Sequence, residues 1–195
     1  MISGDSQRKS HVVGILGLQG AISDHVAHFT RLGAETRIVR SLEELQSIDR
    51  LVLPGGESST MLKLLQRGCL FEGVRDFATQ KPVWGICAGA ILLASEVVNP
   101  TQASLGSIQM RAVRNSYGCQ LDSFSTEIEV PVLGAAIQVD FIRAPRLFSL
   151  QSRAEVLAHL GEDQVLIRQE NILCSAFHTE LGVDSRLHEY FLQMS

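Results

Sequence analysis

Cys87 lies in a sequence pattern that suits a nucleophile. The apolar run 82–86 leads into Gly85-Ile86-Cys87-Ala88-Gly89, and small, apolar, helix-forming residues continue to Ala94. This order of strand, sharp turn and helix is that of a nucleophile elbow, with sulfur in place of the serine oxygen of the hydrolases. Glycine lets the backbone turn tightly, and a helix N-terminus favours a thiolate over a thiol. Taken alone, the segment is equally compatible with a small buried cysteine that has no chemical role.

A histidine and a glutamate near the other end of the chain could activate this thiol. A nucleophilic thiol needs a base that takes its proton, and the base needs a third group that holds its tautomer. His178 can be the base, and Glu180, two residues further on, can orient it. The other histidines are predicted to lie on polar helix faces, at the start of the chain or in loops, without partners; they are His11, His25, His28, His159 and His188.

Two glycine-containing segments complete the set of unusual residues. Gly55-Gly56 stands between Pro54 and Glu57, and Gln19-Gly20 occurs earlier in the chain. A Gly-Gly pair facing the nucleophile can present backbone N–H groups to a developing oxyanion. Glycine-rich loops also bind phosphates, but the spacing and lysine of the phosphate-binding P-loop are absent here.

The predicted elements bring these segments together. Continuous apolar runs predict buried strands at 12–18, 36–39, 51–53 and 83–86, with helical stretches between them. Strands that alternate with helices predict an α/β fold with a mainly parallel sheet. The sequence therefore predicts a single-domain, three-layer sandwich. Each unusual segment (Gln19-Gly20, 54–58, Cys87 and 178–180) directly follows an apolar strand, and sites in such sheets form at the carboxyl ends of the strands.

The second half of the chain is richer in strands. Strand-like runs occur at 126–130, 137–142, 155–158, 165–169 and 172–177. The last two are joined by Glu170-Asn171 as in a hairpin, and an amphipathic helix is predicted over 185–193. No linker or repeat divides the chain, so we expect one domain over residues 11–195 after a polar, flexible segment at 1–10.

Composition limits the classes of function. The 195 residues are 45% hydrophobic and 19% charged, with a formal net charge of −4 and no run of lysine or arginine. These values indicate a globular protein that binds neither nucleic acid nor a membrane. The start of the chain lacks the apolar segment of a signal peptide. The four cysteines have no metal-ligand spacing, so we expect no metal site and free thiols in a reducing cytoplasm.

Several motifs together resemble a known family. Gly85-Ile86-Cys87-Ala88-Gly89 with the distant His178-x-Glu180 resembles the class I (triad) glutamine amidotransferases, which have a flavodoxin-like fold. More narrowly, nearly the whole chain is similar to the glutaminase subunits of pyridoxal 5′-phosphate synthases. The motifs that carry this similarity are Leu16-Gly17-Leu18-Gln19-Gly20, Leu53-Pro54-Gly55-Gly56-Glu57-Ser58, Val113-Arg114-Asn115-Ser116-Tyr117-Gly118, Asp122-Ser123-Phe124, Phe141-Ile142-Arg143-Ala144-Pro145 and Phe177-His178-Thr179-Glu180-Leu181.

The resemblance implies a mechanism and a partner. Cys87 would attack the side-chain amide of L-glutamine, His178 would move the protons, and Glu180 would hold the imidazole. The resemblance further implies an oxyanion hole formed by the backbone of Gly56 and Ala88, and glutamine-binding residues at Gly56, Glu57, Ser58, Arg114, Ile142 and Arg143. No cofactor is implied. Ammonia would pass to a separate synthase subunit for vitamin B6 biosynthesis, within a large hetero-oligomer that couples to this subunit through Gln19 and Gly20.

Two alternatives stay open at this stage. The chain could be a non-catalytic protein that uses the same fold to bind a ligand or partner, because fold alone does not fix function. It could also be the glutaminase subunit of a different biosynthetic synthase. One departure from the family pattern concerns the site: Thr179 stands where proline is usual, so the constrained backbone between His178 and Glu180 is lost.

Overall fold

Five neighbouring parallel strands form the half of the sheet that carries the site segments. The computed structural model describes residues 11–114, 123–150 and 153–195. The strands in spatial order are β2 (Glu35–Val39), β1 (Val12–Leu16), β3 (Arg50–Leu53), β4 (Val83–Ile86) and β12 (Ile172–Ser175). Every residue of β3, β4 and β12 is buried, as expected for parallel strands covered on both faces. This is the strand order of a flavodoxin-like sheet.

The sheet continues beyond β12 with mixed strand directions. The next strands are β11 (Asp163–Gln169), β9 (Arg146–Ser149), β6 (Ile108–Val113) and β5 (Ala94–Val98), and β10 (Glu155–Leu160) also pairs with β11. β11 and β12 form the predicted antiparallel hairpin around Glu170-Asn171. A separate two-stranded ribbon consists of β7 (Ser123–Val130) and β8 (Ala135–Ile142), joined by a 3₁₀ turn at Pro131–Leu133.

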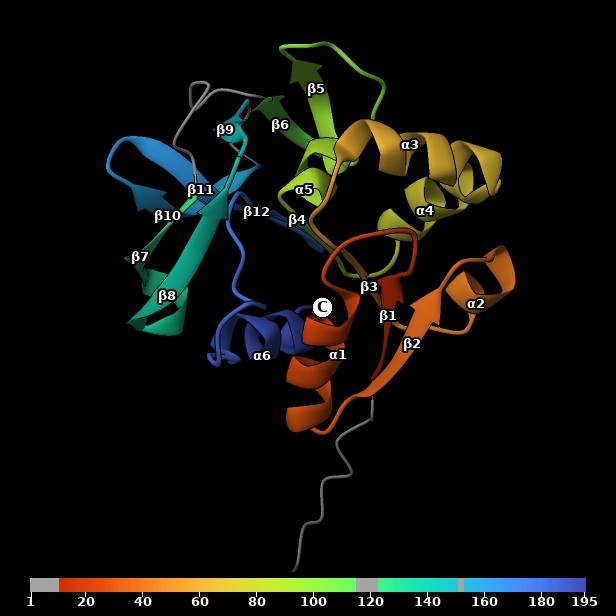
Figure 1. Cartoon of the computed structure of the whole chain (residues 1–195), viewed down its shortest axis with the longest axis horizontal. Coiled ribbons are helices and arrows are strands. Elements are labelled where there is room, and N and C mark those ends of the chain that lie inside the picture. Colours follow the sequence, from red (N-terminus) through yellow and green to blue (C-terminus); the bar gives the residue numbers. More distant parts are fainter. Residues whose placement is uncertain (1–10, 115–122, 151–152) are drawn as a thin grey trace, which may run out of the picture.

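Helices cover both faces of the sheet (Figure 1). α1 (Ile22–Arg31) and α6 (Arg186–Gln193) pack together on one face. The other helices are α2 (Leu42–Gln46), α3 (Ser58–Arg67), α4 (Leu70–Ala78) and α5 (Ala88–Leu93), of which α5 contacts β3, β4 and β12. The predicted α/β fold with three layers and a mainly parallel core is confirmed.

Local sequence signals account for several helix ends. Ser41 accepts a hydrogen bond from the Glu44 N–H, and the Glu44 side chain accepts one from the Ser41 N–H, which is the capping box that the pattern Ser41-Leu42-Glu43-Glu44 predicts. Gly33 follows α1 with a φ of 78°, a conformation that glycine adopts readily. The helix after Cys87 is shorter than predicted, because Ala94 already begins β5.

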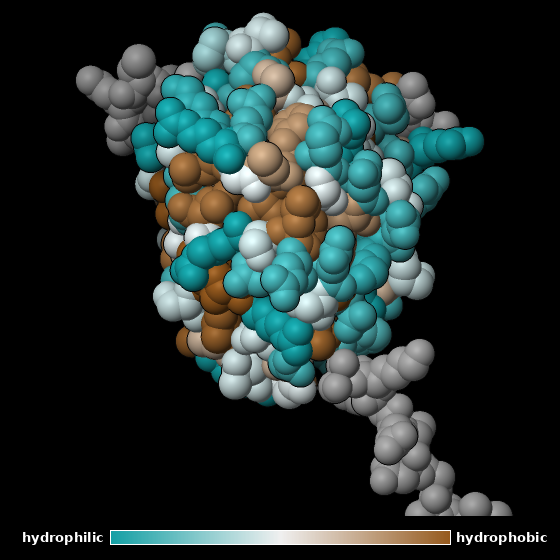
Figure 2. Space-filling view, turned by 90° about the vertical axis from the view of Figure 1, so that its right-hand side faces the viewer, coloured by the Kyte–Doolittle hydropathy of each residue, from teal (hydrophilic) through white to brown (hydrophobic). Residues whose placement is uncertain are grey.

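The surface is mixed in character. The face that lies on the right of Figure 1 carries small apolar areas between many polar side chains (Figure 2). Within the described ranges, no helix has the length and hydrophobicity needed to cross a membrane. The predicted flexible segment 1–10 lies outside the described residues, as do residues 115–118 of the motif at 113–118 and Asp122.

Candidate active site

The four site segments follow neighbouring strands. Gln19 comes after β1, Gly55-Gly56 after β3, Cys87 after β4, and His178 after β12. Because β1, β3, β4 and β12 run parallel and adjacent, their carboxyl ends lie on the same edge of the sheet. The four segments therefore lie at one edge of the sheet, as the sequence predicts.

Cys87 sits in a sharp turn between β4 and α5. Its backbone has φ 49° and ψ −99°, and its N–H donates to the Ser175 carbonyl at 2.8 Å. Two glycines allow this turn because β3, β4 and α5 approach closely there. A Cβ atom at Gly85 would lie 2.6 Å from the Gly89 carbonyl carbon, and one at Gly89 would collide with the Leu53 carbonyl. The Cys87 side chain is consequently held at the start of α5, and the residue is only 6% exposed.

His178 lies between Cys87 and Glu180. Its Nδ1 is 2.6 Å from Glu180 Oε1, and it lines the same pocket as Cys87. The ring packs against Gly55, where any side chain would collide with it. Its backbone is fixed by two hydrogen bonds to Asp140 of β8, at 2.8 and 2.9 Å. The imidazole is therefore held from both sides, by the loop after β3 and by β8.

The environment favours an imidazolium at His178 and a carboxylate at Glu180. Burial alone would lower the pKa of His178, but the neighbouring Cys87 and Glu180 side chains outweigh it and raise the pKa to about 10. Burial also opposes the ionised form of Glu180, yet the hydrogen bond from His178 and the nearby imidazoles keep the pKa of Glu180 below its usual value. The pair is thus poised as a charged hydrogen bond within a buried site.

Three other histidines correct the sequence prediction. His25 and His28 of α1 and His188 of α6 are buried side chains, not members of polar helix faces. His25 Nδ1 lies 3.1 Å from His188 Nε2, and the His28 and His188 rings stack with centroids 4.2 Å apart. The buried face of α1 accordingly consists of His25, His28 and Phe29, whereas apolar spacing alone predicts a face made of Val26, Phe29 and Leu32.

The positions of the other two histidines, His159 and His11, are closer to those predicted. His159 is exposed, and it belongs to strand β10 and not to a loop. His11 is half-buried, and its Nε2 lies 3.4 Å from an Arg50 nitrogen.

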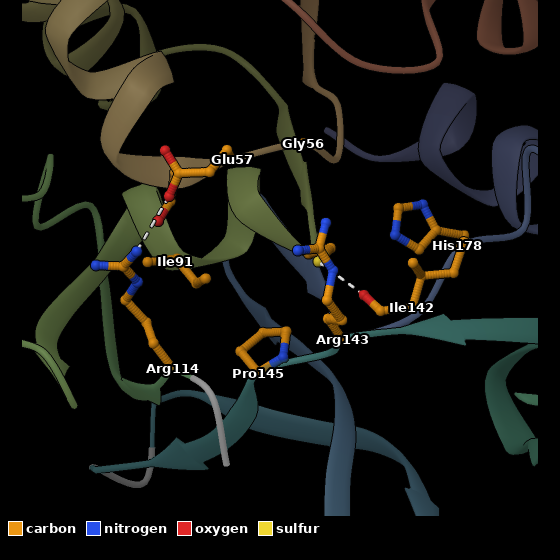
Figure 3. Close-up of a pocket in the computed structure, with 10 residues that line it drawn as sticks. Gly56, Glu57, Ile91, Arg114, Ile142, Arg143, Pro145 and His178 are labelled. Atoms are coloured by element: carbon orange, nitrogen blue, oxygen red, sulfur yellow. Dashed lines mark hydrogen bonds and ion pairs between the residues drawn. The ribbon is translucent and has the colours of Figure 1, made fainter. Parts of the chain in front are cut away.

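A pocket of about 160 Å³ opens in front of Cys87 and His178. Figure 3 shows Glu57, Ile91 and Arg114 on one side of it, with Arg143, Ile142 and His178 on the other. Its lining comprises Gly56, Glu57, Ser58, Cys87, Ile91, Arg114, Ile142, Arg143, Pro145 and His178. All six residues predicted to bind glutamine are in this lining, so the structure brings them together next to the thiol.

The polar residues of the pocket pair with one another. Arg114 Nη2 lies 3.1 Å from Glu57 Oε1, and Glu57 also caps α3 by accepting from the Ser59 and Thr60 N–H groups. Burial works against its charge, but hydrogen bonds from the Ser59 hydroxyl and from the Ser59 and Thr60 N–H groups lower the pKa of Glu57 to about 2. The pocket therefore presents a carboxylate beside a guanidinium, which suits the ammonium and carboxylate groups of an amino acid.

The predicted oxyanion-hole and partner-coupled residues lie around the same loop. The Gln19 side chain donates from Nε2 to the Glu57 carbonyl at 2.6 Å and packs against Gly56, whose φ is 147°. A side chain at Gly20 would collide with the Gly55 carbonyl. Ala88 is the first residue of α5, where backbone N–H groups have no partner within the helix.

Sequence reasoning missed two lining residues and one supporting residue. Ile91 lies one turn after Cys87 on α5, and Pro145 follows β8 at the end of the motif 141–145. Gln102 accepts from the Ser58 hydroxyl at 3.2 Å. Helical spacing from Cys87 could have identified Ile91; no local signal marks Gln102. Among the residues that the structure describes, no three His, Cys, Asp or Glu side chains are grouped to hold a metal ion.

Comparisons with known proteins agree with one another. Residues 15–195 match the model of the SNO glutamine amidotransferase family. The chain is 44% identical over 183 residues to the pyridoxal 5′-phosphate synthase subunit PdxT of Thermosipho africanus, covering 93% of this chain and 97% of that protein. It is 43% identical over 184 residues to the protein of that name from Thermotoga maritima, covering 93% and 98%.

Solved structures show the same likeness. A crystal structure described as a glutamine amidotransferase superposes with a TM-score of 0.87 at 43% identity, covering 93% of this chain and 97% of that one. PurLQS of Thermotoga maritima, at 15% identity, a TM-score of 0.69 and coverage of 93% and 96%, shares the fold.

Proposed function

Because the chain belongs to the SNO glutamine amidotransferase family, we propose that it is the glutaminase subunit of a pyridoxal 5′-phosphate synthase, hydrolysing L-glutamine to L-glutamate and ammonia. The geometric observation that carries the chemistry is the position of His178. Its ring hydrogen-bonds to Glu180 and lines an amino-acid-sized pocket together with Cys87.

We infer the following first half-reaction. The Cys87 sulfur attacks the side-chain amide carbon of glutamine while His178 carries the thiol proton. The negative charge that develops on the amide oxygen is stabilised by the backbone N–H groups of Gly56 and Ala88. When the carbon–nitrogen bond breaks, His178 gives its proton to the departing nitrogen, which leaves as ammonia. The γ-carbonyl of the substrate remains bound to Cys87 as a thioester.

The second half-reaction returns the enzyme to its starting state. A water molecule loses a proton to His178 and attacks the thioester carbon, and the carbon–sulfur bond breaks to release glutamate. Glu180 holds the same His178 tautomer through both steps by accepting the Nδ1 proton. Arg114 and Arg143 bind the α-carboxylate of the substrate, and Glu57 binds its α-ammonium.

The partner is a separate synthase subunit that receives the ammonia. The relatives from Thermosipho africanus and Thermotoga maritima are named as subunits of pyridoxal 5′-phosphate synthase, which favours this synthase over that of another pathway. We propose that this chain joins the synthase subunit in a large hetero-oligomer. The described cysteines, Cys69, Cys87 and Cys174, are free thiols, which supports a cytoplasmic location for the complex.

Replacement of the nucleophile tests the proposed function. Cys87→Ala is expected to abolish ammonia release from glutamine in the presence of the synthase subunit, because no other group near His178 can form the thioester. A glutamine-mimicking electrophile should label Cys87 and spare Cys174, because burial raises the pKa of the Cys174 thiol well above its usual range. Glutamine turnover by Cys87→Ala near the wild-type rate would refute the assignment.

A further inference from the structure

The carboxylate of Glu180 is buried with one oxygen unpartnered. Oε1 accepts from His178, but Oε2 has no hydrogen-bond partner among the described residues, and the side chain is 0% exposed. A buried carboxylate is costly unless donors surround it, because water cannot reach it. His178 supplies one donor on the pocket side. The remaining stabilisation of Glu180 must come from the residues behind it.

His25 is a buried polar side chain next to Glu180. Its Nε2 lies 3.8 Å from Glu180 Oε1, makes no hydrogen bond to any described residue, and belongs to a ring that is fully buried. A second contact from α1 reaches the same residue, since His28 Nε2 lies 3.2 Å from the Glu180 backbone carbonyl. α1 therefore contacts both the side chain and the backbone of Glu180.

His188 determines which His25 nitrogen carries the proton. His25 Nδ1 and His188 Nε2 are 3.1 Å apart, so one must donate and the other accept. If His25 donated from Nδ1, its Nε2 lone pair would face the negative Glu180 carboxylate. If His188 donates instead, His25 carries its proton on Nε2 and directs that N–H toward the carboxylate. The second arrangement places opposite partial charges together, so electrostatics selects it.

We propose that His25, with its tautomer set by His188, is a positioning residue that orients and stabilises the Glu180 carboxylate during glutamine hydrolysis. The inference rests on the proposed function, because it assigns Glu180 the role of holding His178. The line of groups runs from α6 through α1 to the pocket: His188, His25, Glu180, His178 and Cys87. His25 and His188 touch neither substrate nor thiol, so they act only through Glu180.

The neutral state of both imidazoles fits this role. Burial lowers the pKa of His25 to about 4 and that of His188 to about 2, so neither is charged at neutral pH. A cationic His25 would compete with the His178 imidazolium for Glu180, whereas a neutral one contributes only its N–H dipole. The titratable groups that face His25 are Glu180, His178, His28 and Asp24, together with His188.

Replacements at His25 separate positioning from simple packing. His25→Leu removes the N–H, and His25→Gln retains an amide that can donate near the Nε2 position. Phe29→Leu is the matched control, because Phe29 lies one turn further along α1, is fully buried, packs on His188 and has no polar atom in its side chain. For each variant, kcat and KM for glutamine are measured with excess synthase subunit across roughly pH 5–9, because the pH dependence of kcat/KM reports the essential acid and base of the free enzyme.

We expect His25→Leu to lower kcat without changing KM for glutamine. Its kcat should fall on the order of 10–100-fold, the usual effect of removing an outer-shell partner, while KM stays near wild type. The acid limb of kcat/KM should move to higher pH, since loss of the N–H makes Glu180 easier to protonate. His25→Gln should retain most of the wild-type kcat. Phe29→Leu should lower thermal stability without shifting the acid limb of the kcat/KM profile.

Two results would overturn the inference. One is a His25→Leu variant that loses thermal stability but keeps the wild-type kcat and pH profile. The other comes from ¹⁵N-histidine NMR of the unmodified full chain, which needs no variant to fold: a proton on His25 Nδ1 contradicts the proposal, and one on Nε2 supports it. Failure of the proposed function itself is distinguished by the wild-type complex, which would then release no ammonia from glutamine.

Discussion

Two glutamates in the site have opposite surroundings. Glu180 is a fully buried side chain that contacts His178, whereas the Glu57 side chain is 49% exposed and pairs with Arg114 at the pocket. A buried acid next to a catalytic base controls the tautomer of that base. An acid on the pocket wall instead contacts the substrate in both its ground state and its transition state, which changes affinity rather than rate.

These surroundings predict different kinetics for Glu180→Gln and Glu57→Gln. Glu180→Gln is expected to lower kcat by on the order of 10³–10⁴-fold, as when a triad acid no longer holds the right tautomer. Glu57→Gln should mainly raise KM for glutamine, because the proposed ion pair with the α-ammonium is lost. Steady-state ammonia release with the synthase subunit present measures both. Equal losses of kcat in the two variants, with KM unmoved, would contradict these assignments.

The raised pKa of His178 also predicts a pH dependence of stability. Its pKa is about 10 in the folded protein and 6.5 for an ordinary histidine, so folding takes up a proton between these values. The stabilisation from this proton is therefore complete below pH 6.5 and is lost as the pH rises toward about 10. Denaturant unfolding of wild type and His178→Gln should show a stability difference that shrinks across that window. A difference that grows with pH would mean that His178 is neutral in the folded chain.

At the level of residues, sequence alone could identify the groups that belong to short motifs. Cys87, His178 and Glu57 were recognised because each stands beside glycines or after a strand. The buried role of His25 could not be recognised, since its partner His188 is 163 positions away. From sequence alone, a histidine on a helix is assigned to the polar face. His25 is buried because α1 packs against α6.

At the level of elements, the elbow depends on contact between β3, β4 and α5. Gly85→Ala is expected to lower the free energy of unfolding by about 1–3 kcal/mol, because a methyl group there forces packed backbone apart. The clash is with backbone of the α5 turn, 2.6 Å from the added carbon. Gly182→Ala is the matched control, since its nearest neighbour is 3.7 Å away. Thermal or urea unfolding of both variants measures the difference, and equal stability would show that the turn can relax.

The predicted elements were most accurate where burial and local capping agree. The parallel strands β1, β3 and β4 combine continuous apolar residues with turn signals, and the capping box at Ser41 marks α2. The strands β5, β6 and β9 were not predicted. β5 begins within the small apolar run after Cys87, where helix and strand have the same hydrophobic pattern, and its strand state is decided by pairing with β6.

At the level of the whole molecule, Gln19 links the loop after β1 to the proposed oxyanion hole. Its side chain holds the Glu57 carbonyl at 2.6 Å and packs against Gly56. The loop after β3 contains two consecutive glycines, Gly55 and Gly56, whose peptides can rotate at little steric cost. A partner that contacts Gln19 would therefore change the conformations available to this loop, and with them the direction of the Gly56 N–H.

We therefore expect this chain to be a weak glutaminase alone and to be activated by the synthase subunit. One oxyanion donor contributes about 2.7–4 kcal/mol, or roughly 10²–10³ in rate, so activation of that size is expected if docking turns one N–H into place. Initial rates of ammonia release are compared for the chain alone and with excess synthase subunit, in wild type and in Gln19→Ala. Gln19→Ala should lose most of the activation while still binding the partner, because the contact that transmits docking to the loop is gone. An isolated chain that already runs at the full rate, or a Gln19→Ala variant with normal activation, would show that the oxyanion hole forms without this coupling.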